Sequence, residues 1–201
     1  MRDLHRDLTP MTQEEKLEKM FGPFLGPARL NIGCAGNKLD GWVNLDKDPR
    51  AEPDVVADIT VRAPFDVRRF DTILASHVLE HIPKQDLFKV FANLWLMLKS
   101  GGHLICIVPY GSSDDAWDNP HHHQLFTENT FAYFSSRLYE QGNSAGYKAY
   151  EGQEYCDWQI ALQSLVPYPE YSQWKPDMLN DAKHRFRNVI QELHVVMKAV
   201  K

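Results

Sequence analysis

The chain has 201 residues, 43% of them hydrophobic and 24% charged, which is the composition of a globular domain and excludes a disordered chain. This length predicts a single domain. The formal net charge of −5 disfavours a protein that is held to nucleic acid by its overall field. One dense basic group, formed by Lys183, Arg185 and Arg187, remains a candidate local patch.

The sequence also indicates a compartment. No stretch reaches the roughly 20 apolar residues that span a bilayer, and no apolar run follows the charged segment 1–7 as it would in a signal peptide. The three cysteines, Cys34, Cys106 and Cys156, are odd in number and widely spaced, which favours a reducing environment over a disulfide framework. We therefore expect a cytoplasmic protein that does not insert into membranes.

The N-terminal region, 1–27, is predicted to contain one short helix. Thr12 and Glu15 have the spacing of a capping box, which marks the start of a helix over about 12–21. Leu17, Met20 and Phe21 give this helix one apolar side.

Region 28–109 is predicted to alternate strands with a helix. The helix covers about 84–99, where apolar residues recur at three- and four-residue steps, and Gly101-Gly102 is expected to stop it. Short apolar runs bounded by turn residues predict five strands, at 29–33, 42–46, 54–57, 70–75 and 103–109. Continuous apolar strands are typical of a parallel sheet covered on both faces, and the alternation predicts an α/β architecture.

The remaining regions are predicted to be a cap and a closing part of the sheet. Region 110–150 is rich in turn-forming, histidine and aromatic residues, with one predicted helix at 127–135, and is expected to form a loop-rich cap that orders when ligand binds. Region 151–201 is expected to supply C-terminal strands, at 154–166 and 186–199, separated by a proline-rich connection. The last strand is predicted to be antiparallel.

A glycine-containing turn follows the first predicted strand. That strand ends at Gly33, and the small residues after it allow the backbone to turn sharply and approach a ligand. Asp46 closes the next strand, where its carboxylate can accept two hydrogen bonds from a ribose diol. The glycine spacing differs from the dinucleotide fingerprint and no Gly-Lys-Ser/Thr follows, so neither a dinucleotide site nor a Walker A site is predicted.

The glycine turn and three further stretches resemble motifs of the class I S-adenosylmethionine-dependent methyltransferases, particularly of the broad type-11-like group with a compact glycine loop. Asp58 follows the third strand, segment 70–82 resembles the family's fourth-strand motif, and segment 98–104 resembles its turn into the fifth strand. The resemblance covers about 28–110. It implies a Rossmann-like methyltransferase fold with a mostly parallel central sheet, and S-adenosylmethionine as cofactor. The cofactor-binding residues it implies are Asn31, Gly33, Cys34, Ala35, Gly36, Asn37, Asp46, Asp58, Ile59, Ser76 and His77.

The chain departs from the family pattern at one place. Only 34–41 separate the first two strands, fewer than the dozen residues that a helical crossover takes. The helix that usually follows the glycine loop must therefore be reduced to a turn or lost. Cofactor binding would then rest more on the backbone amides of 33–37 and on Asp46.

Segment 77–81 reads His-x-x-Glu-His, the inverted zinc-protease motif, with both histidines expected on one helix face. Because the segment directly follows a strand of the methyltransferase-like core, a metal-dependent hydrolase is the least favoured interpretation. The stretch also resembles the metal-binding Glu-x-x-Glu-His of plant-type small-RNA 2′-O-methyltransferases. Glu80 and His81 match that pattern, and His77 stands at the first Glu.

A metal is not expected, because Leu79-Glu80-His81 is also a packing feature of metal-free relatives. If a metal is bound, the predicted ligands are His77, Glu80, His81 and His122.

His77 and His122 are the candidate general bases, because histidine titrates near neutral pH. Neighbouring residues of an extended segment alternate sides, so at least one of the triplet 121–123 is expected to share a pocket with His77. Tyr110 and Trp117 follow the fifth strand near the expected acceptor site, where ordinary aromatic packing is the alternative interpretation and the one preferred for Trp117.

The predicted function is methyl transfer from S-adenosylmethionine to a small-molecule or glycan-type acceptor. A catalytically inactive cofactor-binding partner subunit is the alternative from another class. No Asn-Pro-Pro-Tyr tetrad follows the fourth strand, which disfavours a DNA adenine target. The sequence leaves the acceptor and the oligomeric state open.

Overall fold

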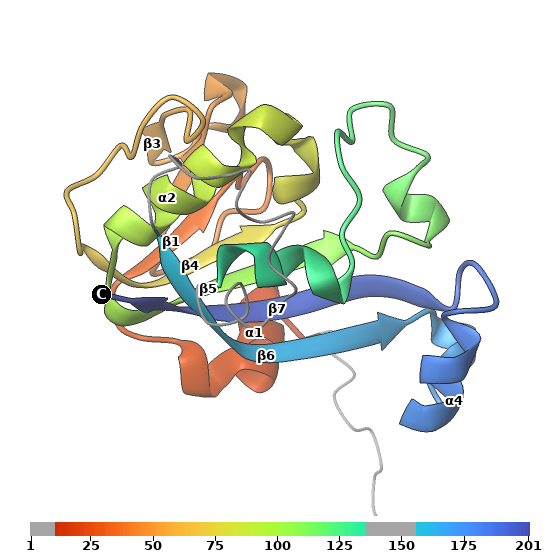
Figure 1. The fold of residues 1–201 in the computed structure, drawn as a ribbon. Helices are drawn as coiled ribbons and strands as arrows, with labels where there is room; N and C mark the ends of the chain where they lie inside the picture. The colour runs from red at the N-terminus through yellow and green to blue at the C-terminus, as the bar shows by residue number, and fades with distance from the viewer. Residues whose placement is uncertain (1–10, 136–155) are drawn as a thin grey trace, which may run out of the picture.

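The computed structural model describes residues 11–135 and 156–201, which form a central sheet with helices on both faces (Figure 1). Within these residues the sheet has seven strands in the order β3-β2-β1-β4-β5-β7-β6. In chain order they are β1 (Arg29–Ile32), β2 (Val43–Asp46), β3 (Val55–Val56), β4 (Phe70–Ser76), β5 (Leu98–Pro109), β6 (Asp157–Pro167) and β7 (Ile190–Val200). Strands β1 to β5 pair in parallel, and β7 runs antiparallel between β5 and β6. The predicted α/β class, the mostly parallel sheet and the antiparallel closing strand are confirmed.

Short helices connect these strands. The α-helices are α1 (Gln13–Phe21), α2 (Leu87–Met97) and α4 (Pro176–Ala182). The 3-10 helices are η1 (Gly22–Phe24), η2 (Pro49–Ala51), η3 (Leu79–His81), η4 (Lys84–Asp86), η5 (Asp114–Ala116), η6 (Glu128–Phe134) and η8 (Pro169–Tyr171). Within the described ranges, no helix combines the length and the apolar character needed to cross a membrane.

The two faces of the sheet carry separate apolar clusters because neighbouring side chains of a strand point to opposite faces. On β5, Leu104 and Cys106 face the cluster that includes α2 and η6, whereas Ile105 and Ile107 face the cluster that includes α1. Figure 1 shows α1 and α2 on opposite sides of the sheet. The sheet therefore has both faces covered, as its continuous apolar strands predict.

The predicted N-terminal helix is confirmed in detail. Thr12 caps α1, with its hydroxyl accepting from the Glu15 amide at 3.2 Å while its own amide donates to the Glu15 carboxylate at 2.7 Å. The helix buries Leu17 and Phe21 against the sheet. The prediction for Met20, also placed on the apolar side, is wrong, because this residue is 44% exposed.

The predicted end of the second helix is wrong. Helix α2 ends at Met97, and Gly101-Gly102 lie inside β5 instead of stopping the helix. Phe70 pairs with Leu98 but Thr72 pairs with His103, so four residues of β5 face one residue of β4. Gly101 has a φ of +75°, which this bulge requires.

The loop between β1 and β2 contains no helix, as its length predicts. Polar side chains hold it instead. The Asn31 amide donates to the Asn37 carbonyl and to the Asn44 side-chain oxygen, both at 3.1 Å, and the Leu39 amide donates to that same Asn44 oxygen at 2.9 Å. The buried side-chain amides of Asn31 and Asn44 thus supply hydrogen-bond partners for loop backbone groups, which a helix would pair internally.

The predicted cap segment differs from the expectation in its described part, and 136–150 lie outside the described residues. The helix expected at 127–135 is the 3-10 helix η6, capped by Thr127. Phe131 and Phe134 of this helix are buried in the main core against Phe91 of α2. This stretch is therefore part of the core.

The basic group near the C-terminus is neutralised by acidic partners. These ion pairs are Lys183 with Glu128, Arg185 with Asp181 at 2.9 Å, and Arg187 with Asp114 at 2.7 Å. The group does not form the unpaired basic surface that nucleic-acid binding needs.

Candidate active site

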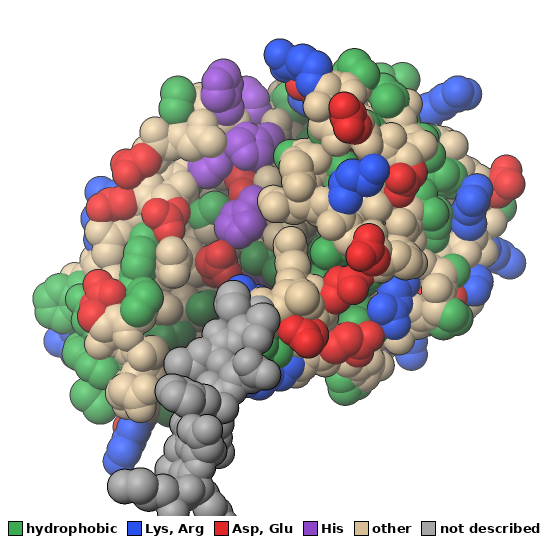
Figure 2. All heavy atoms as spheres, turned by 180° about the vertical axis from the view of Figure 1, so that it is seen from behind, with side chains coloured by type: hydrophobic (Ala, Val, Ile, Leu, Met, Phe, Trp, Pro, Cys, Tyr) green, Lys and Arg blue, Asp and Glu red, His purple; other side chains and the backbone are tan. Residues whose placement is uncertain are grey.

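Two clefts open beside the carboxyl ends of the parallel strands. The strand-end cleft has a volume of about 600 Å³ and the histidine–acid cleft about 560 Å³. The strand-end cleft is lined by Gly33, Ala35, Leu45, Asp46, Lys47, Ala57, Asp58, Ile59, Thr60, His77, Val78, His81, Ile82, Pro83, His121 and His123. The histidine–acid cleft is lined by His77, Glu80, His81, Pro109, Asp115, Asp118, Asn119, His122, Gln191 and Glu192. His77 and His81 line both clefts, and Figure 2 shows histidine side chains gathered on one face with acidic side chains beside them.

The glycine turn forms one wall of the strand-end cleft. Gly33 has a φ of +59°, and a Cβ there would lie 2.5 Å from the Cγ2 of Val78. Only glycine allows the loop after β1 to approach the segment after β4 this closely. Ala35 also has a positive φ, of +43°, so the turn continues tightly past the strand end.

Asp46 connects this turn to the end of β2. One of its carboxylate oxygens accepts from the Ala35 amide and the other from the Asp48 amide, both at 2.8 Å. Each carboxylate oxygen has two lone pairs, so both retain capacity for a ligand. Asp58 lines the same cleft, with one oxygen accepting from the amide and the hydroxyl of Thr60 at 2.8 and 2.7 Å.

The structure brings together about half of the residues predicted to bind the cofactor. Those that line the strand-end cleft are Gly33, Ala35, Asp46, Asp58, Ile59 and His77. Those that do not are Asn31, Cys34, Gly36, Asn37 and Ser76. The Asn31 amide supports the loop, and Cys34 is buried, which raises the pKa of its thiol.

Sequence reasoning missed several residues of the strand-end cleft. Ile82 and Pro83 follow η3 and border the cleft on the side of Val78. Their position directly after the fourth-strand motif is the sequence feature that could have predicted them. His121 and His123 belong to the triplet of which at least one residue was expected beside His77, but neither was predicted to border the cofactor cleft.

His77 lies where the two clefts meet, in an unusual backbone conformation. Its φ is +54°, and its amide donates to the Ile107 carbonyl at 2.8 Å. Its Nε2 lies 3.1 Å from Glu192, and its Nδ1 lies 3.4 Å from Glu80. The Glu192 carboxylate, followed by that of Glu80, raises the pKa of His77 to about 10. An imidazolium has no lone pair, so this geometry favours a donor role over the general base predicted from sequence.

The segment after His77 is a 3-10 turn, so the helix face expected for His77 and His81 is wrong. Its only helical residues are those of η3, Leu79–His81. The inverted zinc-protease motif needs both histidines on one α-helical face. The hydrolase interpretation therefore has no structural support.

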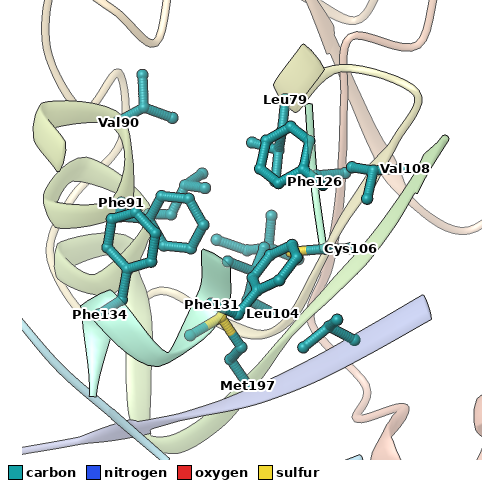
Figure 3. Close-up of a cluster of buried hydrophobic side chains, with 14 of the residues drawn as sticks. Leu79, Val90, Phe91, Leu104, Cys106, Val108, Phe126, Phe131, Phe134 and Met197 are labelled. Atoms are coloured by element: carbon teal, nitrogen blue, oxygen red, sulfur yellow. The ribbon is translucent and has the colours of Figure 1, made fainter. Parts of the chain in front are cut away.

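Hydrogen bonds from the His123 amide and from the Gln124 side chain hold the histidine triplet against the segment of η3. The His123 amide donates to the Glu80 carbonyl at 2.8 Å. The Gln124 side chain donates to the carbonyls of Leu79 and Ile82 at 3.0 and 3.2 Å. Below them, Leu79 and Phe126 belong to the same buried core (Figure 3).

This fastening distributes the triplet between the clefts. His121 and His123 border the strand-end cleft, whereas His122 borders the histidine–acid cleft. This is the alternation expected of an extended segment, and each of the three shares a cleft with His77.

Tyr110 and Trp117 are not site residues in the structure, because neither lines a cleft. The Tyr110 hydroxyl donates to the Glu128 carboxylate at 2.9 Å from a buried position. Trp117 is 58% exposed, and its indole nitrogen donates to the Gly111 carbonyl at 3.0 Å.

Comparisons with known proteins agree with this architecture. The family described as "Methyltransferase domain" matches residues 40–106. No curated protein matches the chain in sequence. A S-adenosylmethionine-dependent methyltransferase from Archaeoglobus fulgidus has a similar structure, with a TM-score of 0.58, 16% identity and 92% of each chain covered.

Two other similar structures were solved with S-adenosylhomocysteine. The N-methyltransferase NodS from Bradyrhizobium japonicum has a TM-score of 0.57 and 15% identity over 94% of this chain and 85% of NodS. The 1,6-didemethyltoxoflavin-N1-methyltransferase from Burkholderia thailandensis has a TM-score of 0.53 and 15% identity over 92% of this chain and 76% of that enzyme. The family match over residues 40–106, the strand order and these similar structures show that the chain has the fold of S-adenosylmethionine-dependent methyltransferases.

Proposed function

We propose that this protein transfers a methyl group from S-adenosylmethionine to a neutral, polyhydroxylated acceptor, a small molecule or a glycan-type substrate. The strand-end cleft holds the cofactor and the histidine–acid cleft holds the acceptor. The observation that carries this assignment is that the two clefts share His77 and His81, so ligands in them meet at one point.

The residues of the strand-end cleft suit a nucleoside cofactor. Its volume of about 600 Å³ is within the range of small-molecule sites. Asp46 retains two acceptor oxygens for the ribose hydroxyls, and Asp58 faces the same space. Leu45 and Ile59 supply apolar surface for a base. The bound cofactor supplies an activated methyl group, so the protein's task is to orient the two ligands.

The histidine–acid cleft suits a neutral acceptor that carries hydroxyl groups. Side-chain oxygens and amides of Asp118, Asn119 and Gln191 face it and can bind hydroxyl groups as donors or acceptors. Its carboxylates belong to Glu80, Asp115, Asp118 and Glu192. This acidic lining repels phosphates, which argues against a nucleic-acid acceptor.

A hydroxyl acceptor must lose a proton to become nucleophilic. The Nδ1 of His122 lies 3.0 Å from the Ala116 carbonyl and donates to it, so in the neutral ring Nε2 is the nitrogen with the lone pair. His122 therefore offers the acceptor cleft a lone pair, to accept a proton or to hold a cation. The ring of His77 donates to Glu192 and stabilises negative charge nearby.

The proposal is tested with purified protein and methyl-labelled cofactor. Neutral oligosaccharides and polyols, their phosphorylated forms, amines and an RNA oligomer are offered as separate acceptor groups. We expect label in the neutral hydroxyl group, and an Asp118→Asn variant with raised KM for acceptor but unchanged affinity for S-adenosylhomocysteine. An Asp66→Asn variant, changed at an exposed site outside both clefts, is the matched control.

Label confined to amines or phosphorylated acceptors would overturn the acceptor class. Amines form a separate group because NodS and the toxoflavin enzyme are named as N-methyltransferases. Absence of S-adenosylhomocysteine binding in calorimetry would overturn the assignment of the strand-end cleft.

A further inference from the structure

We infer that Glu80, His81 and His122 form a binding site for a divalent first-row transition metal ion in the histidine–acid cleft. One ligand atom from each of the three residues lies within 4.8 Å of the others. Two imidazoles and one carboxylate are a ligand set that binds Zn²⁺, Fe²⁺ or Co²⁺. The inference is independent of the proposed function, because it rests on the positions of these three side chains alone.

The first observation is the state of Glu80. The residue is 1% exposed, and neither carboxylate oxygen has a hydrogen-bond partner. The ring of His77 pairs with Oε1 at 3.4 Å without a directed hydrogen bond, and this ion pair leaves Oε2 without a partner. A buried carboxylate left in this state is costly, so a further cation or donor is expected beside it.

The second observation is the orientation of the two imidazoles. The Nδ1 of His81 lies 3.3 Å from the His121 carbonyl, and the Nδ1 of His122 lies 3.0 Å from the Ala116 carbonyl. A carbonyl oxygen can only accept, so Nδ1 carries a proton in both rings, and Nε2 is the nitrogen with the lone pair in the neutral tautomer. Metal-ligating histidines are characteristically held in this way, with the second ring nitrogen donating to a backbone carbonyl.

The third observation is the setting of the cluster. Asp115, Asp118 and Glu192 line the same cleft, and their charge raises the local concentration of cations. Three protein ligands leave coordination positions open toward the cleft, as in metal sites that bind an exogenous oxygen ligand. His77 is not part of the set, because its two nitrogens face Glu192 and Glu80.

The test measures metal binding directly, without a methyl acceptor. Full-length protein is treated with a chelator, dialysed, and titrated with Co²⁺, Zn²⁺ and Mg²⁺ by calorimetry, with visible absorption reporting the Co²⁺ ligand field. We expect one equivalent of Co²⁺ or Zn²⁺ to bind, and Mg²⁺ to bind far more weakly because it prefers all-oxygen sites.

Three variants locate the site. His122→Ala and Glu80→Gln should weaken Co²⁺ binding by about 100-fold or more, since loss of even an outer partner of a metal ligand costs 10–100-fold. His184→Ala, which removes an exposed histidine outside both clefts, should bind Co²⁺ like the unchanged protein. Zn²⁺ should raise the melting temperature of the unchanged protein and of His184→Ala, but not of His122→Ala.

His122 is only partly buried, so His122→Ala keeps the test valid if Glu80→Gln fails to fold. Equal Co²⁺ affinity in His122→Ala and His184→Ala would overturn the inference, and so would a titration with no specific binding. S-adenosylhomocysteine binding is measured in parallel, so loss of the metal site and loss of the proposed cofactor site are separate results.

Discussion

The two clefts differ in how the chain builds them. The strand-end cleft is formed mostly by 33–60 and 77–83, segments that directly follow β1 to β4. The histidine–acid cleft joins η3 to 115–122 and to the start of β7, more than 100 residues away. A cleft at parallel strand ends follows from the topology of the sheet, whereas the second cleft exists only once distant segments have packed.

The clefts also differ in the forces that stabilise them. In the strand-end cleft, the Asp46 carboxylate accepts hydrogen bonds from two backbone amides. The wall at Gly33 is formed by backbone without a side chain. In the histidine–acid cleft, Glu80 is buried without a hydrogen bond. The polar groups of the first cleft are thus satisfied by the protein itself, whereas in the second cleft Glu80 is paired with His77 through one oxygen and its other oxygen has no partner. Substitutions that act on one cleft, or on the segment that both clefts share, should therefore have different effects.

The largest effect is expected at the shared support. Leu79 is fully buried and anchors η3, whose residues border both clefts. Leu79→Ala removes three buried carbons and leaves a cavity, which should lower the free energy of unfolding by about 2–5 kcal/mol. Urea denaturation followed by circular dichroism measures this loss.

Val67→Ala is the matched control for Leu79→Ala, because Val67 is 64% exposed. It should change the free energy of unfolding by less than about 0.5 kcal/mol. Equal losses in the two variants would contradict the assigned role of Leu79.

The next effect separates the two clefts. Asp46→Ala removes the acceptors proposed for the ribose hydroxyls and the hydrogen bond that holds the Ala35 amide. We expect affinity for S-adenosylhomocysteine to fall by about 1.5–3 kcal/mol, or roughly 10- to 150-fold. Calorimetry measures this affinity, and Asp118→Ala, in the other cleft only, should leave it unchanged. Unchanged affinity in Asp46→Ala would remove the ribose assignment.

The comparison also explains what the sequence could predict. Thr12 and Glu15 act within one turn of the chain, so the capping box predicts α1 correctly. Asp46 ends β2, and Asp58 lies two residues beyond the neighbouring parallel strand β3, so their meeting in one cleft follows from strand order. In each case a local pattern or a general rule of topology determines the position.

Where side-chain direction or distant packing decides, the sequence was insufficient. Asn31 and Cys34 belong to the predicted motif, but their side chains turn into the protein and not toward the cleft. Gly101-Gly102 reads as a helix stop, yet the pairing of β4 with β5 makes it a bulge. The approach of His122 to Glu80 depends on Phe126 packing in the core and on Gln124 bonding to η3. No local signal reports these contacts.

Two glycine substitutions test whether the strand-end cleft needs the close approach of its loop to Val78. A Cβ at Gly33 would lie 2.5 Å from Val78, whereas a Cβ at Gly36 meets nothing within 4 Å. Gly33→Ala should therefore lower the free energy of unfolding by about 1–3 kcal/mol, and Gly36→Ala should change it by less than about 0.5 kcal/mol. Both are measured by urea denaturation. Similar stability of the two variants would show that the loop does not need its close approach to Val78.

The smallest effect concerns the anchor of the segment that carries the histidine triplet. Glu128 of η6 accepts from the Tyr110 hydroxyl and pairs with Lys183. Partial burial raises the pKa of Glu128, but hydrogen bonds from Lys183, the backbone and Tyr110 outweigh it and hold the pKa below its usual value. A carboxylate with a depressed pKa stabilises the fold above its unfolded pKa, near 4.3, and loses that contribution as pH falls through the folded value.

Glu128→Gln should accordingly lower the free energy of unfolding by about 1 kcal/mol at pH 7. The substitution removes a charge-assisted hydrogen bond, and the partial exposure of Glu128 reduces what that bond contributes. The gap between the variant and the unchanged protein should shrink as pH falls below about 4, because protonation of Glu128 then removes the same charge that the substitution removes. Urea denaturation at a series of pH values measures the gap. Glu170→Gln, at an exposed position of η8, should show no gap at any pH. A gap for Glu128→Gln that stays constant from pH 7 to pH 3 would mean that shape, and not the charge of Glu128, holds η6 in place.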